Sequence, residues 1–150
     1  MEITRTALVP RPAMAMFRLV EDIERYPDFL SWCAAADLIE QSGDMQLARL
    51  EVSLAGLRQD FTTRNRLERG QRLSMSLVDG PFRQLSGEWR FLALGDSGCK
   101  ITLDLAFDFS NSVLSAAFRR GFSNVADRLV ADFVRRAEAV YTQGEENGKP

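Results

Sequence analysis

The chain has 150 residues, of which 45% are hydrophobic, and a formal net charge of −2 at neutral pH. This length suits one globular domain, and so weak a net charge selects neither DNA nor an anionic membrane as a partner. The sequence contains no histidine, which excludes Ser-His-Asp and Cys-His catalysis and removes the commonest zinc ligand.

Residues 2–9 are predicted to form the first strand. Along them Ile3, Arg5 and Ala7 alternate with Thr4, Thr6 and Leu8, until Pro10 ends the run. Pro12 suits the first turn of a helix. Residues 13–23 are predicted to form that helix, with four apolar side chains on one side: Met16, Phe17, Val20 and Ile23. Because the residue before a proline resists the helical conformation, the helix is expected to stop at residues 24–27. A short turn or second helix is expected at residues 28–32.

From Cys33 onward the apolar period changes from about four residues to two. The pattern is clearest at residues 50–54, 73–77 and 101–109, where apolar and polar side chains alternate. Glycines stand between these runs at hairpin spacing. Strands of about ten residues joined by tight turns predict an antiparallel meander of six further strands.

The last long segment, residues 112–142, contains no proline and predicts one helix of roughly 45 Å. Its apolar residues share one side: Leu114, Phe118, Phe122, Val125, Leu129, Phe133, Ala137 and Val140. Such a stripe needs a large apolar cover, which a curved seven-stranded antiparallel sheet supplies. We therefore expect an α+β fold in one domain over residues 1–143, with two short helices between the first two strands. Residues 144–150 are expected to be a disordered tail.

The inward side of the predicted sheet is apolar except for Thr63 and Asn65. The inward side chains either fill the interior or leave a ligand pocket between sheet and helix. A buried Asn65 needs hydrogen-bond partners, which backbone, water or a ligand carbonyl can supply. Catalysis is disfavoured, because four carboxylates on the strands fall in the outward phase: Glu51, Glu88, Asp104 and Asp108.

Several arginines fall on the outward side of the strands, among them Arg64 and Arg66. They form either a patch for phosphate, such as ribosomal RNA, or a solvated face balanced by neighbouring glutamates. No aromatic residue is interleaved with them for base stacking, which favours the solvated face.

The two cysteines, Cys33 and Cys99, lie far apart and match no metal-ligand spacing. We expect buried, unpaired thiols, no bound metal and no covalent cofactor. No secretory signal and no apolar run of about 18 residues occurs in the sequence. A cytoplasmic protein with at most peripheral membrane contact is therefore expected.

Three segments carry a resemblance to a known family: VEDIERYPDFLSWC at residues 20–33, FTTRNRL at 61–67 and LVDGPFRQLSGEWRF at 77–91. Together they resemble the START-like coenzyme-Q-binding family of the polyketide cyclase/dehydrase-like superfamily. Within it the chain is most similar to the bacterial RatA-type proteins, including the opening strand ITRTALV at residues 3–9. The similarity extends from about Glu2 to Tyr141. The chain departs from it at Ser31, where relatives commonly have proline.

The resemblance implies a helix-grip fold with a hydrophobic tunnel between the sheet and the terminal helix. It further implies binding of ubiquinone or another polyisoprenoid lipid in support of respiration. As the alternative it implies a RatA-type toxin that binds the large ribosomal subunit and blocks subunit association. These two functions use different surfaces, since the first needs the inner face of the sheet and the second the outer face.

Within such a tunnel, Thr63 and Asn65 are the candidates for contact with the polar head of a ligand. The remaining predicted ligand-binding residues are apolar: Phe61, Met75, Leu77, Trp89, Phe91, Leu103, Leu105, Phe107, Phe118, Phe122, Val125 and Leu129. Four residues form either a lid over the tunnel mouth or a plug that never opens: Tyr26, Pro27, Phe29 and Trp32.

Overall fold

The computed structural model describes residues 1–110 and 115–148, with side chains as far as Tyr141. Seven strands form one sheet in the order β1-β7-β6-β5-β4-β3-β2. Their bounds are β1 Glu2–Val9, β2 Cys33–Ser42, β3 Met45–Leu54, β4 Leu57–Glu68, β5 Arg72–Asp79, β6 Phe82–Leu94 and β7 Gly98–Phe109. The helices are α1 (Ala13–Glu21), the 3₁₀ helix η1 (Ile23–Asp28) and α2 (Ala116–Gly148). The predicted seven strands, two short helices and long terminal helix are confirmed.

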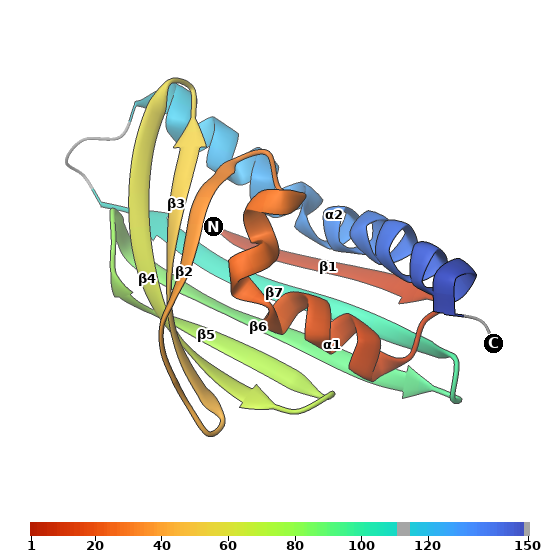
Figure 1. The fold of residues 1–150 in the computed structure, drawn as a ribbon. Coiled ribbons are helices and arrows are strands. Elements are labelled where there is room, and N and C mark those ends of the chain that lie inside the picture. The colour runs from red at the N-terminus through yellow and green to blue at the C-terminus, as the bar shows by residue number, and fades with distance from the viewer. Residues whose placement is uncertain (111–114, 149–150) are drawn as a thin grey trace.

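Every neighbouring pair of strands is antiparallel. The first strand adds beside the last one, so β1 and β2 form the two edges of the sheet. The short helices α1 and η1 therefore carry the chain from one edge to the other, across the open side of the sheet (Figure 1).

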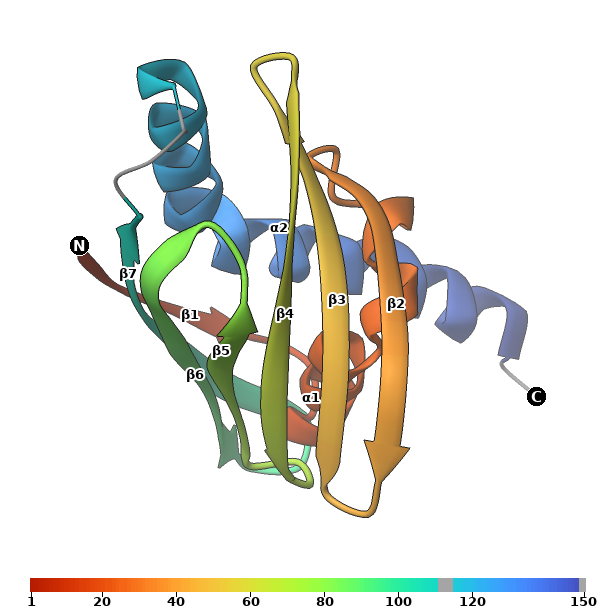
Figure 2. The same cartoon turned by 90° about the vertical axis from the view of Figure 1, so that its left-hand side faces the viewer.

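The sheet is strongly curved (Figure 2). Register shifts place extra residues in β2, β5 and β6, the one in β5 at Val78, opposite Thr62 and Thr63 of β4. Such bulges bend a strand and increase its twist. The bend is also favoured where β5 pairs with β6 over only Arg72 to Ser76. At the end of β5, Gly80 has φ 152°, and a Cβ there would lie 2.5 Å from that of Phe61.

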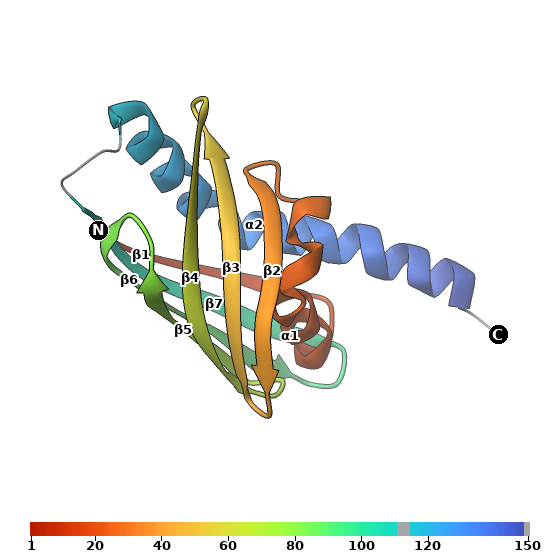
Figure 3. The ribbon, with the colours of Figure 1, turned by 60° about the vertical axis from the view of Figure 1, so that its left-hand side comes forward.

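Helix α2 crosses the concave side of the sheet and contacts β1, β3 and β7 (Figure 3). Its predicted apolar side is buried at Phe118, Phe122, Val125, Phe133 and Ala137. The opposite side is exposed, at Arg120, Asn124, Asp127, Arg128, Arg135 and Glu138. The stripe of α2 and the inner face of the sheet therefore share one hydrophobic core.

The bounds of the helices differ from those predicted. Helix α1 ends at Glu21, because the backbone of Asp22 leaves the helical region with ψ 71°. The second helix then begins at Ile23, earlier than expected, and includes Pro27. Its position is held by the Tyr26 hydroxyl, which donates a hydrogen bond to the Val20 carbonyl at 2.5 Å.

Helix α2 begins at Ala116, and Ser115 caps it by accepting a hydrogen bond from the Phe118 N–H at 3.1 Å. The predicted start at Ser112 and the first apolar position, Leu114, lie outside the described residues. At its other end the helix continues through Gly148 and includes residues 144–148 of the predicted tail. Gly144 does not end it, since the glutamates that follow are good helix formers.

Candidate functional site

A cavity of about 80 Å³ lies between α2 and the inner face of the sheet. Most of the sheet contributes to its wall, through β3, β4, β5, β6 and β7. Helix α2 contributes one side, and η1 with the residues after it closes one end. The lining residues are Ile23, Tyr26, Trp32, Ala48, Leu50, Phe61, Thr63, Asn65, Met75, Leu85, Gly87, Trp89, Leu105, Phe122, Val125, Ala126, Leu129 and Phe133.

Nine of the predicted ligand-binding residues lie in this wall: Phe61, Thr63, Asn65, Met75, Trp89, Leu105, Phe122, Val125 and Leu129. They come together because alternate side chains of the strands and the apolar side of α2 face the same interior. Gly87 completes the wall without a side chain, since a Cβ there would come within 2.7 Å of the Met75 side chain.

Five predicted residues lie elsewhere: Leu77, Phe91, Leu103, Phe107 and Phe118. Four of them are buried in the surrounding core, while Leu77 is half-buried near the end of β5. Phe91 packs edge-on against Phe17 of α1, with ring centroids 5.6 Å apart, and Phe107 packs against Phe122 at 5.1 Å. All five have the predicted inward phase but do not line the cavity, and neighbouring rings cover Phe91 and Phe107.

The polar end of the cavity is a chain of hydrogen bonds. Thr63 Oγ1 donates to Asn65 Oδ1 at 2.9 Å, and Asn65 Nδ2 donates to Gln46 Oε1 at 3.2 Å. Gln46 Nε2 in turn donates to the Glu21 carbonyl at 3.0 Å, at the end of α1. The protein itself thus satisfies the buried amide of Asn65, through the side chains of Thr63 and Gln46 and not through the backbone, water or ligand carbonyl that the sequence suggested.

Gln46 is the residue of this hydrogen-bond network that the sequence did not lead us to expect. It is 1% exposed, and it stands opposite Asn65 in the register of β3 and β4. A signal was present, because Gln46 has the same alternation phase as Ala48, Leu50 and Val52. A polar residue in an inward phase indicates a buried hydrogen-bond network.

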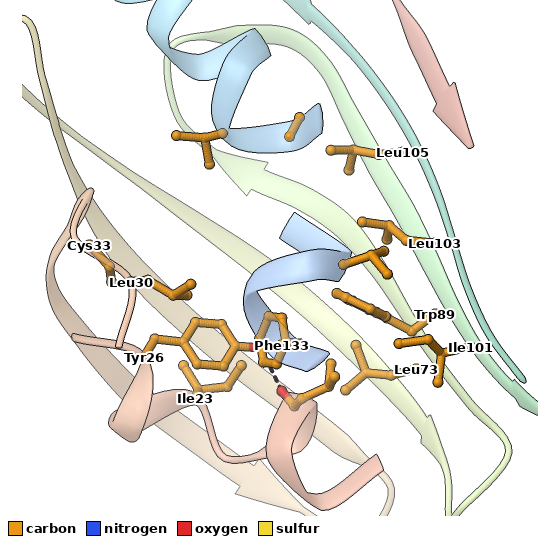
Figure 4. Packing of buried hydrophobic residues seen from close by; sticks show 14 of the residues in the cluster. Ile23, Tyr26, Leu30, Cys33, Leu73, Trp89, Ile101, Leu103, Leu105 and Phe133 are labelled. Atoms are coloured by element: carbon orange, nitrogen blue, oxygen red, sulfur yellow. Dashed lines mark hydrogen bonds between the residues drawn. The ribbon is translucent and has the colours of Figure 1, made fainter. Parts of the chain in front are cut away.

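The predicted lid residues occupy different positions. Tyr26 and Trp32 line the cavity, Phe29 is half-buried beside them, and Pro27 is exposed on the outside of η1. Figure 4 shows Tyr26 beside Phe133 of α2, with Trp89 of β6 on the other side of Phe133. The ring centroids are 5.4 Å apart for Tyr26–Phe133 and 5.2 Å for Trp89–Phe133. This aromatic cluster closes the cavity at the η1 end.

The electrostatics of the cavity are those of an apolar interior. None of its lining residues carries a charged side chain. Among the lining residues, only Tyr26 has an ionisable side chain, a phenol, and burial raises its pKa. The protein can therefore offer a ligand apolar contact and hydrogen bonds there, but no compensating charge.

The strand carboxylates point away from the cavity, as the sequence predicts. Asp104 accepts hydrogen bonds from Thr4 at 2.7 Å and from Arg90 at 2.6 Å, and these bonds hold the pKa of its carboxyl below the usual value. Glu51 pairs with Arg58 at 3.4 Å and Asp108 with Arg83 at 3.7 Å. No pair of carboxylates meets inside the cavity among the described side chains.

The outer face of the sheet divides its arginines into two kinds. Arg49 pairs with Asp60 and Asp37, and Arg72 and Arg90 pair with Glu88. Arg64 and Arg66 are exposed on β4, and their side chains form no ion pair within the described part of the chain. The balanced, solvated face that the sequence favours thus holds for the first group but not for these two.

Cys33 and Cys99 are free and buried. Burial raises the pKa of both thiols, that of Cys33 to about 11. Residues 1–110 and 115–148 contain no cluster of three or more Cys, Asp or Glu side chains that could hold a metal ion. Over the same residues, no helix has the length and apolar character needed to cross a membrane.

Comparisons with known proteins agree with this architecture. A family model described as polyketide cyclase/dehydrase and lipid transport matches residues 9–134. The chain is 45% identical, over 93% of its length and 96% of the relative's, to a protein of Pseudomonas aeruginosa named ribosome association toxin RatA.

More distant matches are named for other activities. A Xenopus laevis protein named coenzyme Q-binding protein COQ10 homolog B is 24% identical over 87% of this chain and 55% of its own length. The solved structure of the ZhuI aromatase/cyclase from Streptomyces sp. R1128 superposes with a TM-score of 0.80 at 19% identity, covering 92% of this chain and 93% of that one. At that identity the superposition establishes the fold alone.

Proposed function

The chain belongs to the polyketide cyclase/dehydrase and lipid transport family, and we propose that it acts within this family as a ribosome-associating protein of the RatA type. The observation that carries the proposal is the 45% identity to a RatA-named relative over 93% of the chain. The expected partner is the large ribosomal subunit, and the expected consequence is a block of subunit association. This proposal places the protein in the cytoplasm.

The outer face of β4 supports the proposal. Arg64 and Arg66 are two positions apart on one strand, so both guanidinium groups lie on the same side of the sheet. Arg69, in the turn that follows β4, is likewise exposed without an ion pair among the described residues. Cations that no carboxylate neutralises are the groups available to phosphates of an RNA backbone.

Sedimentation of the purified protein with isolated ribosomal subunits tests the proposal. We expect the protein to sediment with the large subunit and not with the small subunit. When both subunits are present, it should reduce the yield of joined ribosomes. Recovery of all the protein at the top of the gradient, at low salt and with large subunits in excess, would contradict it.

The interior carries a second candidate function, the binding of an apolar small molecule, for which ubiquinone or another polyisoprenoid lipid is the proposed ligand. The cavity between α2 and the sheet supports it, together with a family description that includes lipid transport. Support for a quinone and a role in respiration is weaker, since the coenzyme Q-binding relative is only 24% identical. The proposed role of the cavity is binding rather than catalysis.

A cavity of about 80 Å³ is smaller than the roughly 300–1,000 Å³ of typical ligand pockets. Ligand entry therefore requires the walls to separate. The segment with Tyr26, Pro27, Phe29 and Trp32 is the proposed lid, because it closes one end of the cavity from outside the sheet. Each methylene that the opened cavity buries contributes about 0.8 kcal/mol, which lets a long tail bind without a strong polar contact.

Extraction of the natively purified protein with organic solvent, followed by mass spectrometry, tests this second function. We expect a neutral lipid at a stoichiometric level in the wild-type extract. The variant Val125→Trp, which places an indole in the cavity, is expected to lack it. An extract without lipid, in combination with no uptake of short-tailed quinones by the purified protein, would end the ligand-binding proposal.

A further inference from the structure

Trp32, a residue of the cavity wall, has a polar side-chain atom for which the described residues supply no partner. Trp32 lines the cavity and is 9% exposed, and its indole Nε1 is buried with no hydrogen-bond acceptor in the described part of the structure. Buried donors are almost always paired, so an isolated one calls for an acceptor that is missing from the protein alone. The N–H of an indole can only donate, and its missing partner must be an acceptor.

The backbone holds this donor in a defined place. The Cys33 N–H donates to the Leu30 carbonyl at 2.9 Å, and the Ser53 N–H donates to the Trp32 carbonyl at 2.8 Å. The second bond ties the residue to the end of β3. These two hydrogen bonds hold the backbone of Trp32 in the closed state of the proposed lid, within the connection between η1 and β2.

The other polar groups of the cavity are already engaged. Thr63 uses its hydroxyl proton on Asn65, whose amide donates to Gln46. The phenol of Tyr26 donates to the Val20 carbonyl. Of the hydrogen-bond donors in the wall, the indole of Trp32 is the one that combines burial with the lack of any acceptor among the described residues.

The wall also limits the charge of a ligand. Its lining residues include no Asp, Glu, Lys or Arg, and burial raises the pKa of the Tyr26 phenol, so that group stays neutral. An anion brought into such a place loses its hydration and gains no opposite charge in return. A carboxylic acid could enter only in its neutral form.

We propose that the cavity selects uncharged ligands and orients them by a hydrogen bond from the Trp32 indole N–H to an acceptor oxygen of the ligand. The inference rests on the proposed ligand-binding function of the cavity and specifies its chemistry: a neutral apolar molecule with a carbonyl, ether or hydroxyl oxygen, not a fatty-acid anion. It assigns the main polar contact with the ligand to Trp32. Thr63 and Asn65 then serve the hydrogen-bond network that joins β4 to Gln46 of β3.

Three small probes of similar shape separate these points: octan-2-one, its hydrocarbon match 2-methyloct-1-ene, and octanoic acid. Each is titrated against a neutral apolar dye, N-phenyl-1-naphthylamine, bound to the full-length protein. The ratio of ketone to hydrocarbon affinity is compared between variants, because the different costs of removing the two probes from water cancel in that comparison.

Trp32→Phe keeps an aromatic ring and removes the donor. We expect it to lower the ketone-to-hydrocarbon ratio by about 3- to 10-fold, the effect of one lost hydrogen bond. The matched control Phe61→Leu, which alters an apolar part of the wall, should change both affinities together and leave the ratio within about twofold. A ratio that Trp32→Phe leaves unchanged would overturn the assignment.

The affinity for octanoic acid should fall about tenfold per pH unit above its pKa, from about pH 6 to about pH 8, because only the neutral acid binds. The affinity for the ketone should stay constant over the same range. Equal binding of octanoate across this range would overturn the selection against charge.

A spectroscopic readout on the wild-type protein avoids any dependence on the folding of a variant. With ¹⁵N-labelled indoles, the Nε1–H resonance of Trp32 should shift downfield when octan-2-one is added and move much less with 2-methyloct-1-ene. Equal shifts would contradict the hydrogen bond. If neither probe displaces the dye or moves an indole resonance, the cavity does not bind ligands and both proposals fail. Binding of the hydrocarbon without a ketone effect would refute the Trp32 assignment alone.

Discussion

The side-chain amide of Asn65 donates a hydrogen bond to Gln46 Oε1 at 3.2 Å across the β3–β4 pair, in which the two residues stand opposite one another. Both residues are 1% exposed. Water cannot replace either partner at such burial, so loss of one side chain leaves the facing amide atom of the other, Gln46 Oε1 or Asn65 Nδ2, without this hydrogen bond. Through Gln46 the same network reaches the Glu21 carbonyl and ties the end of α1 to the sheet.

Asn65→Leu should therefore lower the free energy of unfolding by about 2 kcal/mol, since Gln46 and Thr63 both lose a partner. Urea denaturation followed by circular dichroism measures the change. The matched substitution Asn124→Leu, at an exposed position of α2, should stay within about 0.5 kcal/mol. The double variant with Gln46→Leu should cost clearly less than the two single changes summed. Strict additivity would show that the two amides do not support each other.

The outer face gives a prediction on ribosome association. Arg64→Glu with Arg66→Glu should abolish sedimentation with large subunits and leave thermal unfolding unchanged, because neither side chain forms an ion pair among the described residues. Replacement of a single arginine by alanine should make the negative slope of log affinity against log salt shallower by about 1, if that arginine contacts a phosphate.

The control for that experiment is Arg120→Glu with Arg128→Glu, the same charge change on the exposed side of α2. This variant should sediment like the wild-type protein. Equal loss in both double variants would mean that net charge, and not the face of β4, governs binding.

A third prediction concerns the volume of the cavity. Ala126 lies in the wall on α2 and is 1% exposed, so Ala126→Leu places three further carbons in the space that a ligand would occupy. Exclusion of an equal part of an apolar ligand corresponds to about 2 kcal/mol, or about thirtyfold in affinity for the apolar dye. Ala117→Leu, at an exposed position of the same helix, should leave dye binding unchanged. Equal dye affinity in both variants would show that the dye binds elsewhere.

The thiols give a fourth prediction. Burial raises the pKa of Cys33 to about 11 and also raises that of Cys99, so neither is a thiolate near pH 8. The native protein should react slowly with a disulfide reagent there, and the denatured protein should react rapidly at two thiols. Loss of reactive thiols after denaturation without reductant would reveal a disulfide.

The same pKa shift determines a pH dependence of stability. A thiol whose pKa is higher in the folded than in the unfolded state binds its proton more tightly when folded. Its contribution to stability is complete below the unfolded value of about 9 and is lost as the pH rises toward about 11. Cys33→Ala should flatten the decline in unfolding free energy over that range, and an unchanged decline would assign it to other groups.

Much of the fold could be read from local pattern. The alternation in Gly98–Phe109 predicted a strand with its buried face at Ile101, Leu103 and Phe107, and all three are buried. The spacing of Phe118, Phe122 and Phe133 predicted the covered side of α2. These features depend on the geometry of one segment, so a single sequence contains them. The break after α1 was less accessible, because it comes at Asp22, five residues before Pro27, and Tyr26 bonds back across it to Val20.

Two results depended on how distant segments meet. Leu103 and Leu105 share an inward phase on β7, yet only Leu105 reaches the cavity. The bulges and the bend of the sheet decide where α2 closes on it, and alternation contains no information on that distance. The pairing of Gln46 with Asn65 likewise follows from the β3–β4 register.

The sequence by itself determined the strands, helices α1 and α2, the buried face of the clearly alternating strands and of α2, and the absence of histidine chemistry, because these follow from residue type and spacing along the chain. Only the tertiary structure decided which inward residues surround the cavity, which arginines lack a carboxylate partner, and that the Trp32 indole N–H is buried without an acceptor among the described residues. Hydrogen bonds and ion pairs form between atoms a few ångströms apart, and those atoms come from strands and helices that the folded sheet alone brings together.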